Sequence, residues 1–299
     1  MTGTRKEMLS TAILAAALAG ERILEVYGTD FGVEYKDDDS PLTLADTRSH
    51  ETISSVLGKA FRDVPILSEE GRAASFEERK NHGLFWLVDP LDGTKDFVKK
   101  NGEFTVNIAL VEKERPVLGV IYIPAADTLY YAEGPGAWKA AGIRGMLSGE
   151  KTARTDAGAF FGSVSRVSQK LPLADNASRN GIVIVKSRSH AAESTQAFID
   201  MLGERFADTS ILSSGSATKL CLIAEGSADV YPRLGPTMEW DIAAGDVILE
   251  KSGGRIIALD SLSRMVYNKR VLKNPDFVAV NRRMREDRRL SSILESVLQ

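Results

Sequence analysis

Carboxylates recur at the ends of apolar segments in this sequence. Glu69 and Glu70 follow one apolar stretch, Asp89 and Asp92 follow a second, and Asp241 opens a predicted helix. Strand ends and helix starts are held by the scaffold and can still reach a cleft. With three histidines and one cysteine, a zinc site of Cys and His ligands is nearly excluded. A bound metal would depend on oxygen ligands, which favours a hard cation such as Mg²⁺.

The stretch from Asp89 to Asp92 holds Pro90 and Leu91 between its two acids. Pro90 fixes its own backbone and restricts that of Asp89. Such a turn could aim both carboxylates, and a carbonyl between them, at one point, although their repulsion opposes this unless a cation lies there. Each feature alone has an ordinary explanation, because Glu-Glu and Asp-Gly pairs are common in solvated turns and aspartate is a good N-cap. The metal site is predicted from their conjunction.

Hydrophobic periodicity predicts a mixed α/β chain around these acids. Helices are expected at residues 8–27, 46–61, 191–202, 216–224 and 241–251. Strands are expected at residues 31–36, 64–67, 84–88, 105–111, 117–123, 128–132, 182–186, 255–259 and 277–280. The pattern weakens between them at a stretch rich in Gly, Ser and Ala. We therefore predict an N-terminal metal-binding α+β half at 1–141, an irregular linker or insertion at 142–181, and a C-terminal α/β half for substrate recognition at 182–299.

Composition narrows the class of protein. The chain is 43% hydrophobic and 26% charged, as in ordinary globular proteins, and its net charge of -3 offers no field for nucleic acid. The most apolar early stretch, 12–19, is too short to span a membrane. A single cysteine, Cys221, favours a reducing compartment and fits a small buried hydrophobe. We expect a cytoplasmic monomer or homodimer with no nucleic-acid partner and no integral membrane segment, and weak association with a membrane surface stays open.

Three segments together resemble the motifs of the inositol monophosphatase superfamily of metal-dependent, lithium-sensitive phosphatases: LSEEG at 67–71, WLVDPLDGT at 86–94 and WDIAAG at 240–245. Within that superfamily, the closest resemblance is to the CysQ-type 3'(2'),5'-bisphosphate nucleotidases. It is carried by residues 92–97, 101–110, 187–190, 215–216, 219 and 224–233. The resemblance covers most of the chain. It implies a layered αβαβα sandwich of the inositol monophosphatase and sugar phosphatase type, with two sheet-containing halves.

The resemblance also implies roles for individual residues. Two or three Mg²⁺ ions would be held by Glu69, Asp89, the Leu91 carbonyl, Asp92 and Asp241. Glu70 would act in the shell of water around the metal ions. Asp46 would pair with Thr94 to orient or deprotonate the attacking water, although Asp46 is equally suited to cap the helix that it begins.

Substrate contacts are predicted on both halves of the chain. The backbone at Gly93 and Thr94 would receive phosphate oxygens, since it lies where a helix begins and glycine permits close approach. The remaining candidates are Lys219 and Arg233 for a 5'-phosphate, His190 and Ser216 for the nucleoside, and Asp241. Taken singly, a lysine or arginine is usually a surface charge, and His190 could cap the following helix.

The expected activity is Mg²⁺-dependent hydrolysis of adenosine 3',5'-bisphosphate to AMP and phosphate by a metal-activated water. The sulfated analogue, 3'-phosphoadenylyl sulfate, would be a second substrate, which places the enzyme in sulfur metabolism. An inositol or sugar monophosphate phosphatase with the same metal site is the alternative, and it would not need both Lys219 and Arg233. A nucleotide-sensing or transcription-machinery-binding protein is the non-enzymatic alternative, and the full ligand set argues against it.

Three further features are interpreted structurally. Trp86 and Trp240 flank ligand positions and are expected to pack as supporting core. Residues 77–80 are expected to form an exposed mobile loop near the site, a candidate flap. The basic run at 282–289 is interrupted by acids and is expected to be a solvated face.

Overall fold

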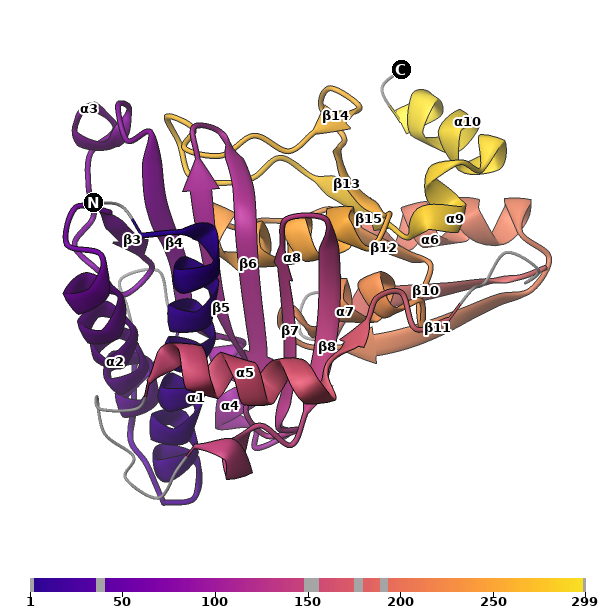
Figure 1. The fold of residues 1–299 in the computed structure, drawn as a ribbon. Helices are drawn as coiled ribbons and strands as arrows, with labels where there is room; N and C mark the ends of the chain where they lie inside the picture. Colours follow the sequence, from indigo (N-terminus) through magenta and orange to yellow (C-terminus); the bar gives the residue numbers. More distant parts are fainter. Residues whose placement is uncertain (1–2, 36–40, 148–155, 175–179, 189–192, 298–299) are drawn as a thin grey trace.

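A layer of three helices covers one face of the first sheet in this computed structural model (Figure 1). α1 (Arg5–Tyr27) begins with a capping box between Thr4 and Glu7 and buries its apolar stripe against α2 (Leu44–Ala60), α5 (Ala157–Val167) and the sheet. The structure describes residues 3–35, 41–147, 156–174, 180–188 and 193–297.

The first sheet has seven strands, and all but one neighbouring pair are antiparallel. Its spatial order is β3 (Ile66–Ser68), β4 (Leu84–Asp92), β5 (Thr105–Glu112), β6 (Arg115–Ile123), β7 (Thr128–Glu133), β8 (Gly136–Ala141) and β9 (Gln169–Lys170). The connections hold α3 (Phe76–Arg79), α4 (Thr94–Val98) and the 3-10 turn η1 (Arg144–Met146). β1 (Val33–Tyr35) and β2 (Pro41–Thr43) pair separately ahead of α2.

Two helices form the middle layer, α7 (Thr218–Glu225) and α8 (Glu239–Lys251). Small residues let this layer pack closely. A Cβ on Gly119 of β6 would lie 2.4 Å from the Ala244 carbonyl oxygen of α8, and one on Gly245 would lie 2.3 Å from Leu220 Cδ1 of α7. Because α8 carries Asp241 in its first turn, this contact determines where that carboxylate lies.

The second sheet lies beyond the middle layer and mixes parallel and antiparallel pairs. Its order is β11 (Thr209–Ser214), β10 (Ile182–Ser187), β12 (Val230–Arg233), β15 (Phe277–Val280), β13 (Arg255–Ala258) and β14 (Ser263–Arg264). Its outer face is covered by α6 (Glu193–Arg205), α9 (Arg282–Arg285) and α10 (Arg288–Val297). One apolar core lies between the first helical layer and the first sheet, a second joins both sheets to the middle helices, and a third lies under the outer helices, which confirms the predicted αβαβα sandwich.

Some predicted elements were wrong in detail. Residues 142–181 are not irregular throughout, because α5 packs on α1 and β9 extends the first sheet. Residues 77–80 belong largely to α3, where Arg79 is buried and donates to Asn268 Oδ1 and to the Arg270 carbonyl oxygen. The strands β2, β8, β11, β12 and β14 were not anticipated either. The division into halves at 141 and 182 stays a prediction.

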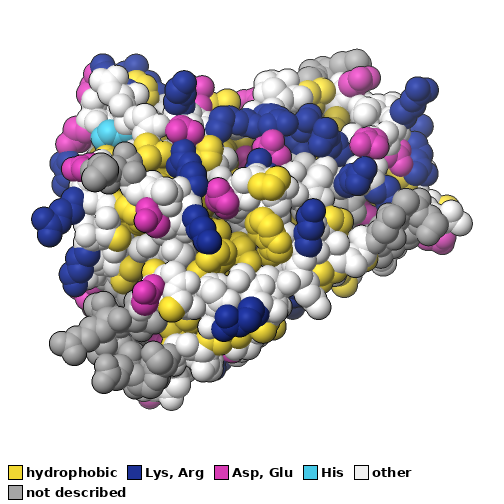
Figure 2. Space-filling view, in the orientation of Figure 1, with side chains coloured by type: hydrophobic (Ala, Val, Ile, Leu, Met, Phe, Trp, Pro, Cys, Tyr) yellow, Lys and Arg dark blue, Asp and Glu magenta, His cyan; other side chains and the backbone are white. Residues whose placement is uncertain are grey.

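Among the described residues, none of the helices has the length and hydropathy required to cross a bilayer. On the face shown in Figure 2, Lys and Arg side chains gather in a band across the upper middle, and in the region of α9 and α10 they are mixed with Asp and Glu. Within this region Arg289 pairs with Asp287, as expected for a solvated face of mixed charge. The absence of a nucleic-acid partner stays a prediction.

Candidate active site

A bulge in β4 brings its two acids to the same cleft. β4 pairs Asp89 with Asn107 and Asp92 with Thr105, so three steps along β4 match two steps along β5. In a regular strand, residues three apart would point to opposite faces, and the extra residue of a bulge reverses this alternation. Both Asp89 and Asp92 therefore line the cleft. Ser49 Oγ donates to the Pro90 carbonyl oxygen at 2.6 Å and holds the bulge against α2.

Three carboxylates from different elements meet here. Glu69 follows β3, Asp89 lies on β4 and Asp241 lies in the first turn of α8, and their oxygen atoms approach within 4.8 Å of one another. Burial raises the pKa of Asp89 well above its ordinary value, and the charges of Glu69, Asp92 and Asp241 raise it further. Burial and the charge of Asp92 likewise raise the pKa of Asp241. A bound cation would relieve this repulsion.

Asp46 and Thr94 contact each other as the sequence predicted. Thr94 Oγ1 donates to Asp46 Oδ1 at 3.1 Å, while the Leu91 carbonyl oxygen lies 3.3 Å from the same hydroxyl. Asp46 also accepts from the Thr43 amide and hydroxyl at 2.7 Å each, as part of the capping box of α2. Burial raises the pKa of Asp46 to about 6, with a further contribution from the charge of Glu70. The prediction that Asp46 begins the helix as its N-cap was wrong, because Thr43 is the N-cap and Asp46 is the third helical residue of the capping box, and its role toward the attacking water stays a prediction.

Cationic side chains line the same cleft, Lys219 and Arg233 among them, and the cleft has a volume of about 380 Å³. Lys219 is buried, and its Nζ donates to the Ser216 carbonyl oxygen at 2.6 Å. Burial lowers the pKa of Lys219 to about 8, and the charge of Arg233 lowers it further while Asp92 opposes this. Arg233 donates through Nη2 to the Pro236 carbonyl oxygen at 2.8 Å, but its buried Nε has no hydrogen-bond partner within the described part of the chain.

Most of the residues predicted for the active site line this cleft. Leu91, Gly93, Thr94 and Ser216 also line it. Gly93 has a φ of 91°, and a Cβ there would lie 3.0 Å from the Glu103 carbonyl oxygen. Glu70 does not line the cleft, although its charge acts on Asp46. His190 lies outside the described residues.

Several lining residues were missed from the sequence. Trp86 is buried as core, as predicted, but Trp240 is only partly buried and forms part of the cleft wall. Tyr231, Thr237 and Lys273 contribute as well. Lys273 comes from the segment before β15, and a β-bridge to Met238 brings it to the start of α8. No local motif marks that residue, because its position depends on a pairing between distant segments.

The side chains fit a hard divalent cation. Every candidate ligand in the three-carboxylate cluster is an oxygen, and burial together with the neighbouring negative charges raises the pKa of Asp89 and of Asp241. Asp92 adds a fourth carboxylate to the cleft, and burial raises its pKa too. Such a cluster is stable at neutral pH when positive charge is present.

Comparison with known proteins assigns the family. The Inositol monophosphatase family matches residues 4–298. The chain is 41% identical over 252 residues to the 3'(2'),5'-bisphosphate nucleotidase CysQ of Salmonella typhimurium, covering 83% of this chain and 89% of that protein. It is 34% identical to the protein of the same name from Haemophilus influenzae, covering 94% and 95%.

Solved structures agree with the fold. CysQ from Bacteroides thetaiotaomicron, described as a bacterial member of the inositol monophosphatase family, superposes with a TM-score of 0.80 at 42% identity, covering 93% of this chain and 98% of that one. An inositol monophosphatase from Thermotoga maritima superposes with a TM-score of 0.71 at 22% identity, which supports the fold alone. The carboxylate cluster, the layered sandwich and these matches together place the chain in the inositol monophosphatase family.

Proposed function

We propose that this protein is a Mg²⁺-dependent phosphatase that removes the 3'-phosphate of adenosine 3',5'-bisphosphate, giving AMP and phosphate. 3'-Phosphoadenylyl sulfate would be a second substrate, giving adenylyl sulfate. The names of the relatives, 3'(2'),5'-bisphosphate nucleotidase, support this substrate class. The observation that carries it is one cleft in which an acidic cluster lies beside cationic side chains, with Lys219 next to Asp92 and Arg233 next to Asp241.

The acidic cluster would hold two or three Mg²⁺ ions through Glu69, Asp89, the Leu91 carbonyl, Asp92 and Asp241. When bound, such ions neutralise phosphate charge, acidify water and stabilise the leaving oxygen. Glu70 would contribute through water in the shell around the metal ions.

Thr94 and Asp46 would handle the proton of the attacking water. Thr94 Oγ1 already donates its hydrogen to Asp46, so its lone pairs are available to accept a hydrogen bond from water. With a pKa near 6, Asp46 is ionised at neutral pH and can still take up a proton. The water oxygen forms a bond to phosphorus as the bond from phosphorus to the 3'-oxygen breaks, and that oxygen leaves as a hydroxyl after protonation.

The rest of the cleft would recognise the non-reacting part of the substrate. Gly93 lets phosphate approach the backbone closely because it has no side chain. Arg233 lines the cleft and can offer its guanidinium to the 5'-phosphate, and Lys219 remains mostly protonated at pH 7. Ser216, with His190 as a further candidate, would contact the nucleoside, and Asp241 would contact both metal and substrate.

The test is phosphate release from adenosine 3',5'-bisphosphate and inositol 1-phosphate, measured side by side with Mg²⁺, with EDTA and with Asp92→Asn. We expect preference for the nucleotide, loss of activity in EDTA and inhibition by lithium. Asp92→Asn should lower kcat by at least about 100-fold. Preference for inositol phosphate would contradict the roles of Lys219 and Arg233, and activity on neither ester would favour a binding protein.

A further inference from the structure

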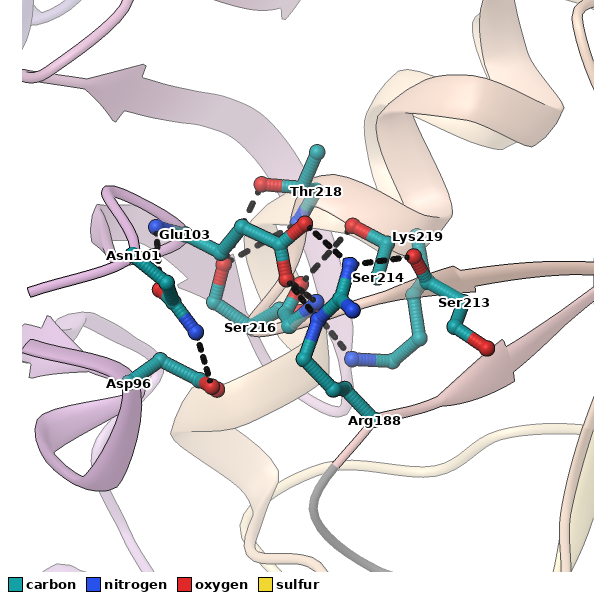
Figure 3. A network of polar contacts seen from close by, with 10 residues as sticks. Asp96, Asn101, Glu103, Arg188, Ser213, Ser214, Ser216, Thr218 and Lys219 are labelled. Atoms are coloured by element: carbon teal, nitrogen blue, oxygen red, sulfur yellow. Dashed lines mark hydrogen bonds and ion pairs between the residues drawn. The ribbon is translucent and has the colours of Figure 1, made fainter. Parts of the chain in front are cut away.

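Three segments that carry the resemblance to bisphosphate nucleotidases meet at one side chain, Glu103 (Figure 3). Arg188, at the end of β10, donates through Nε and Nη2 to the two Glu103 carboxylate oxygens at 2.8 Å each. The Gly215 amide, just before α7, donates to Glu103 Oε2 at 2.8 Å. Glu103 itself lies before β5 on the first sheet. One carboxylate thus joins the first sheet to the second at the edge of the cleft.

The backbone of Glu103 also packs closely against its neighbours. A Cβ on Gly215 would lie 2.8 Å from the Glu103 carbonyl oxygen, and one on Gly93 would lie 3.0 Å from it. Asn101 accepts from the Glu103 amide at 2.9 Å and donates to Asp96 at 2.7 Å. Glu103 therefore contacts both the turn proposed to receive the reacting phosphate and the entry to α7.

From Gly215 the connection continues to a substrate candidate. Ser216 follows directly, with a φ of 47° that is uncommon for a residue other than glycine. Its carbonyl oxygen accepts from Lys219 Nζ at 2.6 Å. The position of the Gly215 amide thus determines where Ser216 directs its carbonyl, and that carbonyl orients the buried Lys219 ammonium.

The ion pair has a geometry suited to positioning. Its two parallel hydrogen bonds fix direction as well as distance, and Arg188 Nη2 also donates to the Ser213 carbonyl oxygen at 2.9 Å. The Glu103 side chain is 25% exposed and that of Arg188 is 46% exposed. Pairs this exposed add little to folding stability, so the main consequence should be orientation at the cleft.

We propose that Glu103, held by Arg188, is a specificity-determining positioning residue that orients Ser216 and Lys219 toward the second phosphate of the substrate. This inference rests on the proposed function. Glu103 does not touch the substrate in this scheme. It selects substrates with two phosphates over those with one by fixing the segment that carries Lys219.

The experiment compares adenosine 3',5'-bisphosphate with adenosine 3'-monophosphate, which lacks only the 5'-phosphate. Glu103→Gln removes the negative charge and keeps an oxygen that can accept from the Gly215 amide. Arg188→Met removes the guanidinium that donates two hydrogen bonds to Glu103, at a position that is partly exposed to solvent. For each variant we expect KM for the bisphosphate to rise about 10-fold, kcat to change less than about twofold, and the monophosphate constants to stay within about twofold. In the double variant, KM for the bisphosphate should rise no more than in Glu103→Gln alone, because both substitutions break the same ion pair.

Asp287→Asn is the matched control, since Asp287 and Arg289 form a similar forked pair, at 3.1 and 2.6 Å, away from the cleft. Asp287→Asn should leave KM and kcat unchanged for both substrates. Equal losses on both substrates, additive losses in the double variant, or unchanged KM in a folded Arg188→Met protein would each overturn the inference. Wild-type protein inactive on the bisphosphate would overturn the proposed function and this inference with it, whereas an active wild type with unaltered variants would overturn the inference alone.

Discussion

At the scale of single residues, the site depends on pairs in which one group sets the state of another. The Thr94 hydroxyl donates its hydrogen to Asp46, so the lone pairs of Thr94 Oγ1 can accept a hydrogen bond from another donor. Lys219 is held by the Ser216 carbonyl and keeps a pKa of about 8 because Asp92 opposes the effect of burial. Each of these side chains is common in proteins. Its chemistry here comes from the partner that the fold places beside it.

The Thr94 hydroxyl provides the first prediction. Thr94→Val keeps the shape and removes the donor to Asp46, so kcat should fall by about 100-fold or more while KM changes little. Steady-state kinetics on the bisphosphate measure both constants. Thr94→Ser restores the hydroxyl and should recover most of the activity. A valine variant with normal kcat would exclude this pair from proton handling.

At the scale of elements, α8 links the site to the first sheet through close packing. The glycines at 119 and 245 allow backbone and side-chain atoms of β6, α7 and α8 to approach within distances that a Cβ would block. The same helix buries Asp246, whose Oδ2 accepts from Tyr267 Oη at 2.8 Å. A helix fixed this firmly can hold Asp241 near Asp89 despite the repulsion between them.

Substitution of Gly119 tests this packing. Gly119→Ala places a methyl group against the Ala244 carbonyl oxygen, so we expect the free energy of unfolding to fall by about 3 kcal/mol. Gly58→Ala on α2, where no atom lies within 4 Å of the new Cβ, should be neutral or stabilising by up to about 1 kcal/mol. Urea unfolding measures both variants. Equal stabilities would show that β6 and α8 separate without cost.

Asp246 predicts how stability depends on pH. Burial raises its pKa from 3.8 to about 6, so the folded state binds more protons than the unfolded state between these values. Stability from this group is therefore highest at low pH and is lost as pH rises through about 6. The full difference corresponds to about 3 kcal/mol.

Asp246→Asn should remove this dependence. The free energy of unfolding of the variant, minus that of the wild type, should increase by about 1 kcal/mol from pH 5 to pH 7.5. Urea unfolding in the presence of EDTA measures both proteins at each pH. Asp260→Asn, at an exposed aspartate, is the control for a change in net charge alone. A wild type and an Asp246→Asn variant with parallel pH profiles would contradict the buried titration.

At the scale of the whole molecule, the acidic cluster joins separate layers. Glu69 and Asp89 belong to the first sheet and Asp241 to the middle helical layer, and Lys219 and Arg233 reach the same cleft from α7 and the second sheet. Occupation of the cluster by a cation should therefore stabilise the assembly of layers as well as supply chemistry.

Metal removal tests this connection. Saturating Mg²⁺ at about 100 times its Kd would add about 2.7 kcal/mol to the folded state, and we expect Tm to rise by about 5 °C relative to EDTA. Asp241→Asn should abolish most of this rise, while the Asp260→Asn control should keep it. Differential scanning calorimetry provides the measurement, and a full rise in Asp241→Asn would place the ion elsewhere.

Local sequence determines most helices of the fold, many of its strands and the choice of acidic site residues. The periodicities predicted α1, α2, α7, α8, most strands of the first sheet and β10, β13 and β15 of the second, because a buried stripe or an alternating face leaves a mark in consecutive residues. The acids at 69, 89, 92 and 241 could be chosen because each stands at the end of an apolar element. The pairing of Asp46 with Thr94 followed from the family resemblance and not from any local pattern.

Other features required the tertiary structure. The bulge that turns Asp92 to the same side as Asp89 exists only in the register with β5, and β9 and α5 acquire their places from partners far along the chain. Lys273 and Trp240 enter the cleft, and Glu103 meets Arg188 and Gly215, through contacts between distant segments. Local sequence carries the chemistry of each side chain, whereas long-range packing decides which of them meet.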